Sequence, residues 1–142
     1  MIYVTTSRMK TNRPIIKLDK TKLDSTLEWA YLLLCFTTIL IISMYYSLLP
    51  ERIPTHIGFG GMVNQYGSKV SIWMLPILQI IIGVAGYYLI KRPHTFNYLT
   101  NITPENVETE YRKGVMILRV VFVMSALILG IVSAIFIRLA IS

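Results

Sequence analysis

Three long apolar runs, free or nearly free of charge, dominate the pattern of the chain. They are Trp29–Leu49 (21 residues), Ser71–Ile90 (20 residues) and Val115–Ile137 (23 residues). An α-helix needs about 20 residues to cross a bilayer core of about 30 Å. The pattern therefore predicts an all-α membrane protein with three transmembrane helices.

Polar segments separate these runs and give the predicted organisation of the chain. Residues 1–28 form a basic arm, and residues 29–142 form one three-helix transmembrane domain with connections at 50–70 and 91–114. Apolar side chains are scattered among the lysines of the arm, at Ile15, Ile16, Leu18, Leu23 and Leu27. This irregular pattern fits either a segment that lies on an anionic membrane surface or a solvated arm that only fixes the topology.

Composition agrees with the apolar pattern. Hydrophobic residues make up 54% of the 142 residues and charged residues 15%, against about 25% charged residues in a typical soluble domain. The mean hydropathy is +0.59. These values exclude a soluble globular domain and an intrinsically disordered chain. The single cysteine, Cys35, cannot form a disulfide within the chain, which excludes a disulfide-stabilised scaffold.

Positive charge is distributed unevenly between the polar segments. Of the 14 Lys and Arg residues, ten lie in 1–28 and 91–114, three lie in 50–70 and the C-terminal tail, and Arg119 lies inside the third run. Loops rich in Lys and Arg stay in the cytoplasm. We therefore expect a cytoplasmic arm, an external loop 50–70, a cytoplasmic loop 91–114 and an external C-terminus. Topology thus explains the formal net charge of +7, and we expect no nucleic-acid partner.

Capping residues predict where two helices begin. Ser25–Glu28 has the order of a capping box, and Thr103-Pro104-Glu105 combines a capping hydroxyl, a proline at the first position and an acid near the helix dipole. A helix from Pro104 to Ile137 has 34 residues and a length of about 51 Å. We therefore expect the third helix to extend into the cytosol. Arg119 is expected to snorkel toward the same side.

Small or polar residues within the runs predict helix packing. An amide exposed to lipid is costly, and small side chains let helix backbones approach closely. The third run carries a row of small residues spaced four apart, whose partner is another span or a second copy of the chain. The predicted packing residues are Gln79, Gly83, Gly86, Ala126, Gly130 and Ala134.

The loop 50–70 is the candidate site of function. Its two prolines favour an extended entry, and Gly58, Gly60 and Gly61 allow a tight reversal with positive φ. Its large apolar residues need a surface to pack on, which is a helix end, the lipid interface or a ligand. The candidate binding residues are Pro50, Glu51, Pro54, His56, Gly61, Asn64, Gly67 and Lys69.

His56 raises the question of a metal site. Its candidate co-ligands on the same face are Glu51 and Asn64, whereas His94 lies in the connection expected on the other side. A zinc site normally has three or four His, Cys or carboxylate ligands, so we expect no metal. His56 then either shapes the loop through a hydrogen bond or contacts a ligand directly.

The sequence lacks the combinations of groups that enzymes need. Cys35 lies at membrane depth without an acid or histidine at its level, and Glu51 is the only acid in 50–70. No glycine-rich loop is followed by Lys-Ser/Thr. We expect no enzymatic activity and no cofactor. Arg119 is the only charged residue within the apolar runs, so transport would require an oligomer or a larger membrane-protein partner.

A resemblance to a known family rests on the loop and its flanks. Leu49-Pro50-Glu51-Arg52-Ile53-Pro54-Thr55-His56, then Gly61, then Tyr66-Gly67-Ser68-Lys69 resembles a bacterial membrane domain of unknown function that forms the N-terminal part of Sdp-type toxin-immunity proteins. The resemblance covers about residues 29–90. It implies the bacterial cytoplasmic (inner) membrane and a role in envelope signalling or toxin immunity. The chain departs from the family at Asn64, where an aspartate is frequent, and at Gly58, where an asparagine is frequent.

These observations predict a small, non-enzymatic, multi-pass protein of this Sdp-immunity-like family. Its external loop recognises a peptide, a toxin or an envelope partner. The alternative is an accessory subunit of a membrane transporter or channel, packed through the small-residue row of the third helix. The predicted partners are the lipid bilayer and a membrane protein or peptide, with a second copy of the chain as a further candidate.

Overall fold

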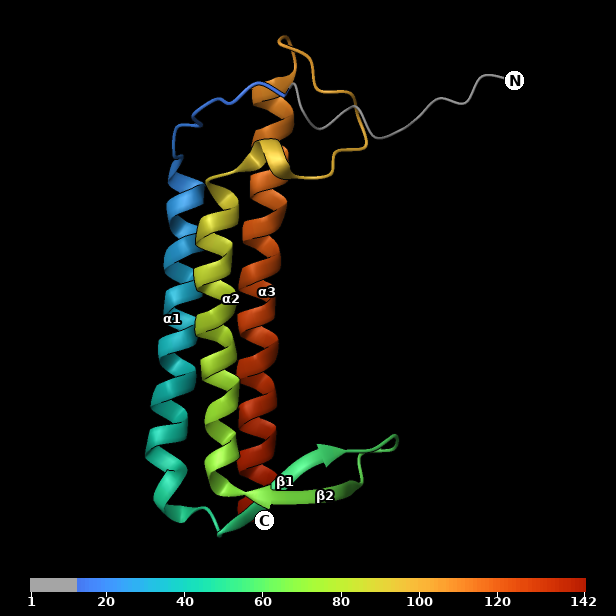
Figure 1. Ribbon diagram of the computed structural model, residues 1–142. Helices are drawn as coiled ribbons and strands as arrows, with labels where there is room; N and C mark the ends of the chain where they lie inside the picture. The colour runs from blue at the N-terminus through green and yellow to red at the C-terminus, as the bar shows by residue number, and fades with distance from the viewer. Residues whose placement is uncertain (1–12) are drawn as a thin grey trace, which may run out of the picture.

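The computed structural model describes residues 13–142. Three helices run side by side, namely α1 (Lys22–Tyr45), α2 (Met74–Ile90) and α3 (Val107–Ile141) (Figure 1). The shorter elements are η2 (Tyr46–Leu48), β1 (Arg52–Ile57), β2 (Val63–Ser68), η3 (Lys69–Trp73) and η4 (Pro93–Thr95). Among the described residues, three helical segments are long and apolar enough to cross a membrane, 22–48, 69–90 and 107–141. The prediction of a mostly helical, multi-pass membrane protein is thereby confirmed.

The connections gather at the two ends of the helix bundle. β1, β2 and the C-terminus lie at one end, which we name the hairpin end (Figure 1). Residues 13–21 and 91–106 lie at the opposite end, which we name the arm end (Figure 1). Of the predicted arm 1–28, residues 1–12 lie outside the described residues, and residues 22–28 belong to α1.

The prediction of an all-α chain is wrong at the hairpin end. β1 and β2 pair antiparallel, from Arg52 opposite Ser68 to Ile57 opposite Val63, in place of an irregular loop. Neither strand shows a clear alternation of apolar and polar positions, because Pro54 interrupts β1 and β2 is largely polar. The strand pattern is therefore hidden in the sequence.

Both observed helix starts differ from the predicted ones. α1 begins before Ser25–Glu28, because Thr21 Oγ1 accepts from the Asp24 N–H at 3.1 Å and Asp24 Oδ2 accepts from the Thr21 N–H at 2.8 Å. This capping box satisfies the helix terminus one turn earlier than expected. α3 begins at Val107. Thr103 and Asn106 close a turn before it, because Asn106 Oδ1 accepts from the Thr103 N–H at 2.9 Å.

A buried glutamine joins the three helices. Gln79 of α2 is 1% exposed, and its Nε2 donates to Thr38 Oγ1 of α1 at 3.2 Å and to the Ala126 carbonyl of α3 at 2.9 Å. The Tyr31 hydroxyl of α1 donates to the Gln79 carbonyl. Gln79 thus faces both neighbouring helices, where its amide donors find partners that lipid could not supply.

The two glycines of α2 accommodate aromatic rings from the other helices. A Cβ on Gly83 would lie 2.7 Å from the Tyr31 ring of α1, and a Cβ on Gly86 would overlap the Phe122 ring of α3. The Tyr31 and Phe122 rings also meet edge to face, with centroids 6.4 Å apart. The absence of a side chain at these two positions therefore lets both rings pack against α2.

The small-residue row of α3 faces the other helices over only part of its length. Ala126 is buried, and a Cβ on Gly130 would lie 3.0 Å from Thr38 Oγ1 of α1. Ala134 is exposed, and Ser133 occupies the buried position at this level instead. The buried positions of α3 repeat with the helical period of about 3.6 residues. A row with a strict spacing of four residues therefore leaves the buried face of the helix.

Aromatic stacking holds the arm against the connection between α2 and α3. Arg13 lies over the Tyr98 ring, 5.4 Å from its centroid, and Tyr98 stacks on Tyr111 with centroids 5.4 Å apart. The Tyr111 hydroxyl donates to the Pro14 carbonyl at 3.0 Å. Burial raises the pKa of Tyr98 to about 12. Residues 13 and 14 of the arm therefore pack on protein at the arm end.

Candidate functional site

The reversal of the hairpin depends on two glycines. Gly60 and Gly61 adopt φ of 91° and 80°, a region that side chains disfavour. The Gly58 N–H donates to the Met62 carbonyl at 2.8 Å, and the Gly61 N–H donates to the Gly58 carbonyl at 3.1 Å. Positive φ thus occurs at two of the three glycines that the sequence singled out, and Gly58 has an ordinary φ.

The base of the hairpin is fixed to the helix bundle by an apolar cluster. Ile53 of β1 is 1% exposed and packs with residues from the helices and their connections, Ile42, Leu49, Ile72 and Ile137. Pro54 is also buried. An irregularity of register follows it, between Pro54 and His56, which is where a sheet tolerates proline. β1 is therefore anchored, and β2 can be held by its pairing with β1.

Two side-chain pairs hold the strands together, one nearer the turn and one at the base. His56 Nδ1 lies 2.6 Å from Asn64 Oδ1. Because that oxygen can only accept, the contact favours the tautomer with the proton on Nδ1, and Nε2 has no protein partner among the described residues. At the base, Lys69 Nζ donates to Glu51 Oε1 at 2.8 Å, and the Lys69 N–H donates to the Glu51 carbonyl at 3.0 Å.

The structure therefore distributes the predicted binding residues along the hairpin and does not gather them in one cavity. Pro50 is exposed at the entry. Gly67 lies under Thr55, because a Cβ at this position would be 2.8 Å from Thr55 Cγ2. Within residues 13–142, no group of three His, Cys, Asp or Glu side chains is placed to hold a metal ion.

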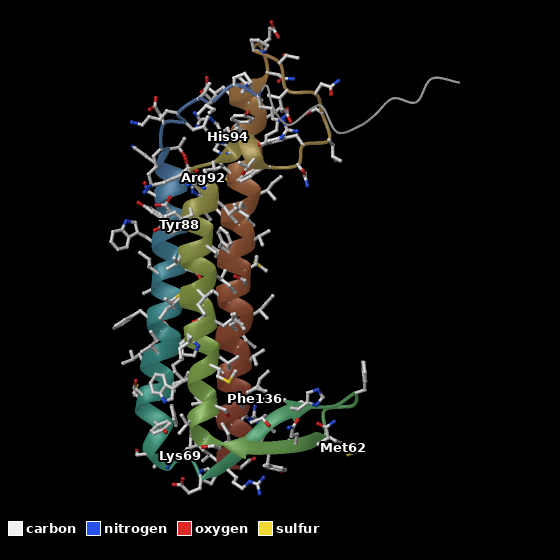
Figure 2. The ribbon with its side chains drawn as sticks, viewed as in Figure 1. Met62, Lys69, Tyr88, Arg92, His94 and Phe136 are labelled. Atoms are coloured by element: carbon white, nitrogen blue, oxygen red, sulfur yellow. The ribbon has the colours of Figure 1, made fainter. Side chains whose placement is uncertain are left out.

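Exposed apolar side chains mark the far end of the hairpin. Phe59 is fully exposed, and Met62 is 75% exposed. Figure 2 shows Met62 at the turn, well away from the helices, whereas Lys69 lies beside them. Tyr66 adds an exposed ring on β2. The hairpin thus presents uncovered apolar groups on a rigid base.

Sequence reasoning missed a buried ionic cluster near the arm end. Arg119 of α3 is 8% exposed, and its guanidinium contacts Asp24 Oδ1 at 2.6 Å and Glu28 Oε1 at 3.0 Å, both from α1. Lys20 pairs with the other oxygen of Glu28. Arg119 is therefore paired with acids of the same chain. The spacing of Asp24 and Glu28, four residues apart, places both acids on one helix face and was the available signal.

Comparison with known proteins covers only part of the chain. Residues 33–80 match a domain of unknown function, DUF1648. No curated protein and no solved structure matches the chain. The matched segment contains about the second half of α1, the whole hairpin and the first turns of α2, and therefore all eight candidate binding residues and Gln79. The match carries no activity with it, and α3 lies outside it.

Proposed function

We propose that this protein lies in the cytoplasmic membrane of a bacterium and that its hairpin binds a peptide or protein partner outside the cytoplasm. The observation that carries the proposal is that β1 is anchored to the helix bundle while β2 is exposed. β1 is buried at Ile53 and Pro54, whereas β2 has mostly exposed residues. The two strands form a complete sheet of their own within the described residues.

The free edge of β2 suits the addition of a strand. A peptide in extended conformation can hydrogen-bond to the backbone groups of an uncovered edge, and its side chains then supply specificity. β2 contains no proline, so each of its residues has a backbone N–H, and the groups that do not face β1 are available to an added strand. The exposed groups of Phe59, Met62 and Tyr66 supply apolar contacts beside that edge. Because the hairpin is already anchored, binding does not have to order it.

The orientation in this proposal follows from the charges at the two ends. Ten Lys and Arg residues belong to segments 1–28 and 91–114, and three belong to the segments of the hairpin end, Arg52, Lys69 and Arg138. The more positive end is cytoplasmic by the positive-inside rule. The hairpin then faces the exterior, where a toxin or an envelope protein meets it.

The proposed role is binding without catalysis. His56 is paired with an amide and Glu51 with a lysine, and neither pair places a base beside a nucleophile. A toxin-immunity role is one form of this proposal, and it is supported by the resemblance of the hairpin motif to Sdp-type immunity proteins. An accessory subunit of a transporter or channel has weaker support, because Ala126 and Gly130 pack against helices of the same chain.

Site-specific photo-crosslinking in the source bacterium tests the proposal. A photoreactive phenylalanine analogue at Phe59 should capture a discrete partner. Leu99 is the matched control, because it is an equally exposed apolar residue at the arm end. The double variant His56→Ala, Lys69→Ala should insert normally and lose the adduct. Identical adducts from positions 59 and 99, or an adduct that survives the double variant, would contradict the proposal.

A further inference from the structure

A groove between α1 and α2 is open along one side of the bundle near the arm end. Its volume is about 800 Å³, which is within the range of about 300–1,000 Å³ typical of ligand sites. Residues 16–20 of the arm line its polar end, and α3 contributes to its wall through Arg119 and Phe122. Its apolar part is lined by Leu27, Leu32, Cys35, Ile80, Val84 and Phe122.

The groove has the depth of one membrane leaflet. The α1 residues that line it run from Asp24 to Cys35, a rise of about 16 Å at 1.5 Å per residue. This rise is about half of a hydrocarbon core of about 30 Å. Tyr31, which also lines the groove, donates to the Gln79 carbonyl and brings α1 and α2 together. The apolar part of the groove therefore lies where a lipid chain of that leaflet would lie.

The polar end of the groove has more cations than anions. It is lined by five cationic residues, Lys17, Lys20, Lys91, Arg112 and Arg119, and by three acidic ones, Asp19, Asp24 and Glu28. Arg119 and Lys20 pair with the acids of α1. Within residues 13–142, Lys17 and Lys91 have no carboxylate partner. Lys91 Nζ donates to the Tyr87 hydroxyl and lies 3.9 Å from the centroid of the Tyr87 ring. Figure 2 shows Tyr88 and Arg92 at this same end of the bundle.

We infer that this groove binds one anionic phospholipid, with its phosphate between Lys17 and Lys91 and an acyl chain along Leu32 and Val84. The apolar walls match the chain, and the two cations without carboxylate partners match the negative phosphodiester. A zwitterionic lipid would place its own cation beside the same lysines, so it fits less well. This inference rests on the arm end alone and is independent of the role proposed for the hairpin.

Native mass spectrometry of the full chain in mild detergent tests the inference. Phosphatidylglycerol should bind at one copy per protein and about thirtyfold more tightly than phosphatidylcholine with the same chains, because both Lys17 and Lys91 attract the anionic headgroup. The double variant Lys17→Gln, Lys91→Gln should lose this preference. Lys22→Gln, Lys113→Gln is the matched control, because it removes the same charge from residues at the arm end that do not line the groove.

A second variant tests the apolar part of the groove separately. Val84 is 53% exposed and lines the groove, so Val84→Phe should fold and should weaken the binding of phosphatidylglycerol by filling the space for the chain. Glycerol phosphate, which has the headgroup chemistry without chains, should not compete. Equal binding of the two phospholipids, an equal loss in the control pair, or full competition by glycerol phosphate would overturn the inference. None of these outcomes would affect crosslinking at the hairpin.

Discussion

Arg119 shows how a single side chain couples two helices that the apolar pattern treats as separate. Its guanidinium donates one hydrogen bond to Asp24 and two to Glu28 of α1, and only 8% of the side chain is exposed. A buried charge without partners is expensive, so each member of this cluster depends on the others. The cluster thus aligns α1 and α3 near the arm end.

Replacement of Arg119 by methionine should destabilise the protein by about 3 kcal/mol, since it leaves the buried Asp24 carboxylate without its cation. The value lies at the low end for a buried pair, because Glu28 is partly exposed and still pairs with Lys20. Thermal unfolding in detergent measures the effect. Arg138→Met is the control, because Arg138 is exposed near the C-terminus. Equal small losses in both variants would show that the cluster does not hold α1 and α3 together.

The sequence predicts the three helices better than their ends or the hairpin, and each difference has a physical reason. Membrane length and apolar composition identify the three helices, because lipid allows few alternatives. The ends are set by local hydrogen bonds, and Thr21 with Asp24 competes successfully with Ser25–Glu28 as the start of α1. The hairpin was expected only as an ordered loop around His56. The pairing of His56 with Asn64 depends on the register between the two strands. The irregularity after Pro54 shifts this register, and no local sequence pattern indicates the shift.

Helix contacts are likewise only partly visible in the sequence, and a matched pair of variants tests them. Gly130→Leu should destabilise the protein by about 2 kcal/mol, because its side chain would push against Thr38 of α1. Ala134→Leu belongs to the same row but should have little effect, since Ala134 is exposed. Melting temperatures in detergent compare the two. A greater loss for Ala134→Leu would show that this row contacts another chain.

The uneven distribution of positive charge predicts how the whole molecule is oriented in the membrane. Segments 1–28 and 91–114 of the sequence contain ten Lys and Arg residues, whereas segment 50–70 and the C-terminal tail contain three. If all three candidate spans of residues 13–142 cross the membrane, the arm and the C-terminal residues lie on opposite sides of it. Reporter fusions after residues 12, 60, 100 and 142 should therefore give cytoplasmic, external, cytoplasmic and external signals in that order, because Lys and Arg near the ends of spans resist translocation. Paired reporters, one active only in the cytoplasm and one only outside it, make each position its own control. A cytoplasmic signal at residue 60 would place the hairpin inside the cell, and the partner proposed for it would then have to be cytoplasmic as well.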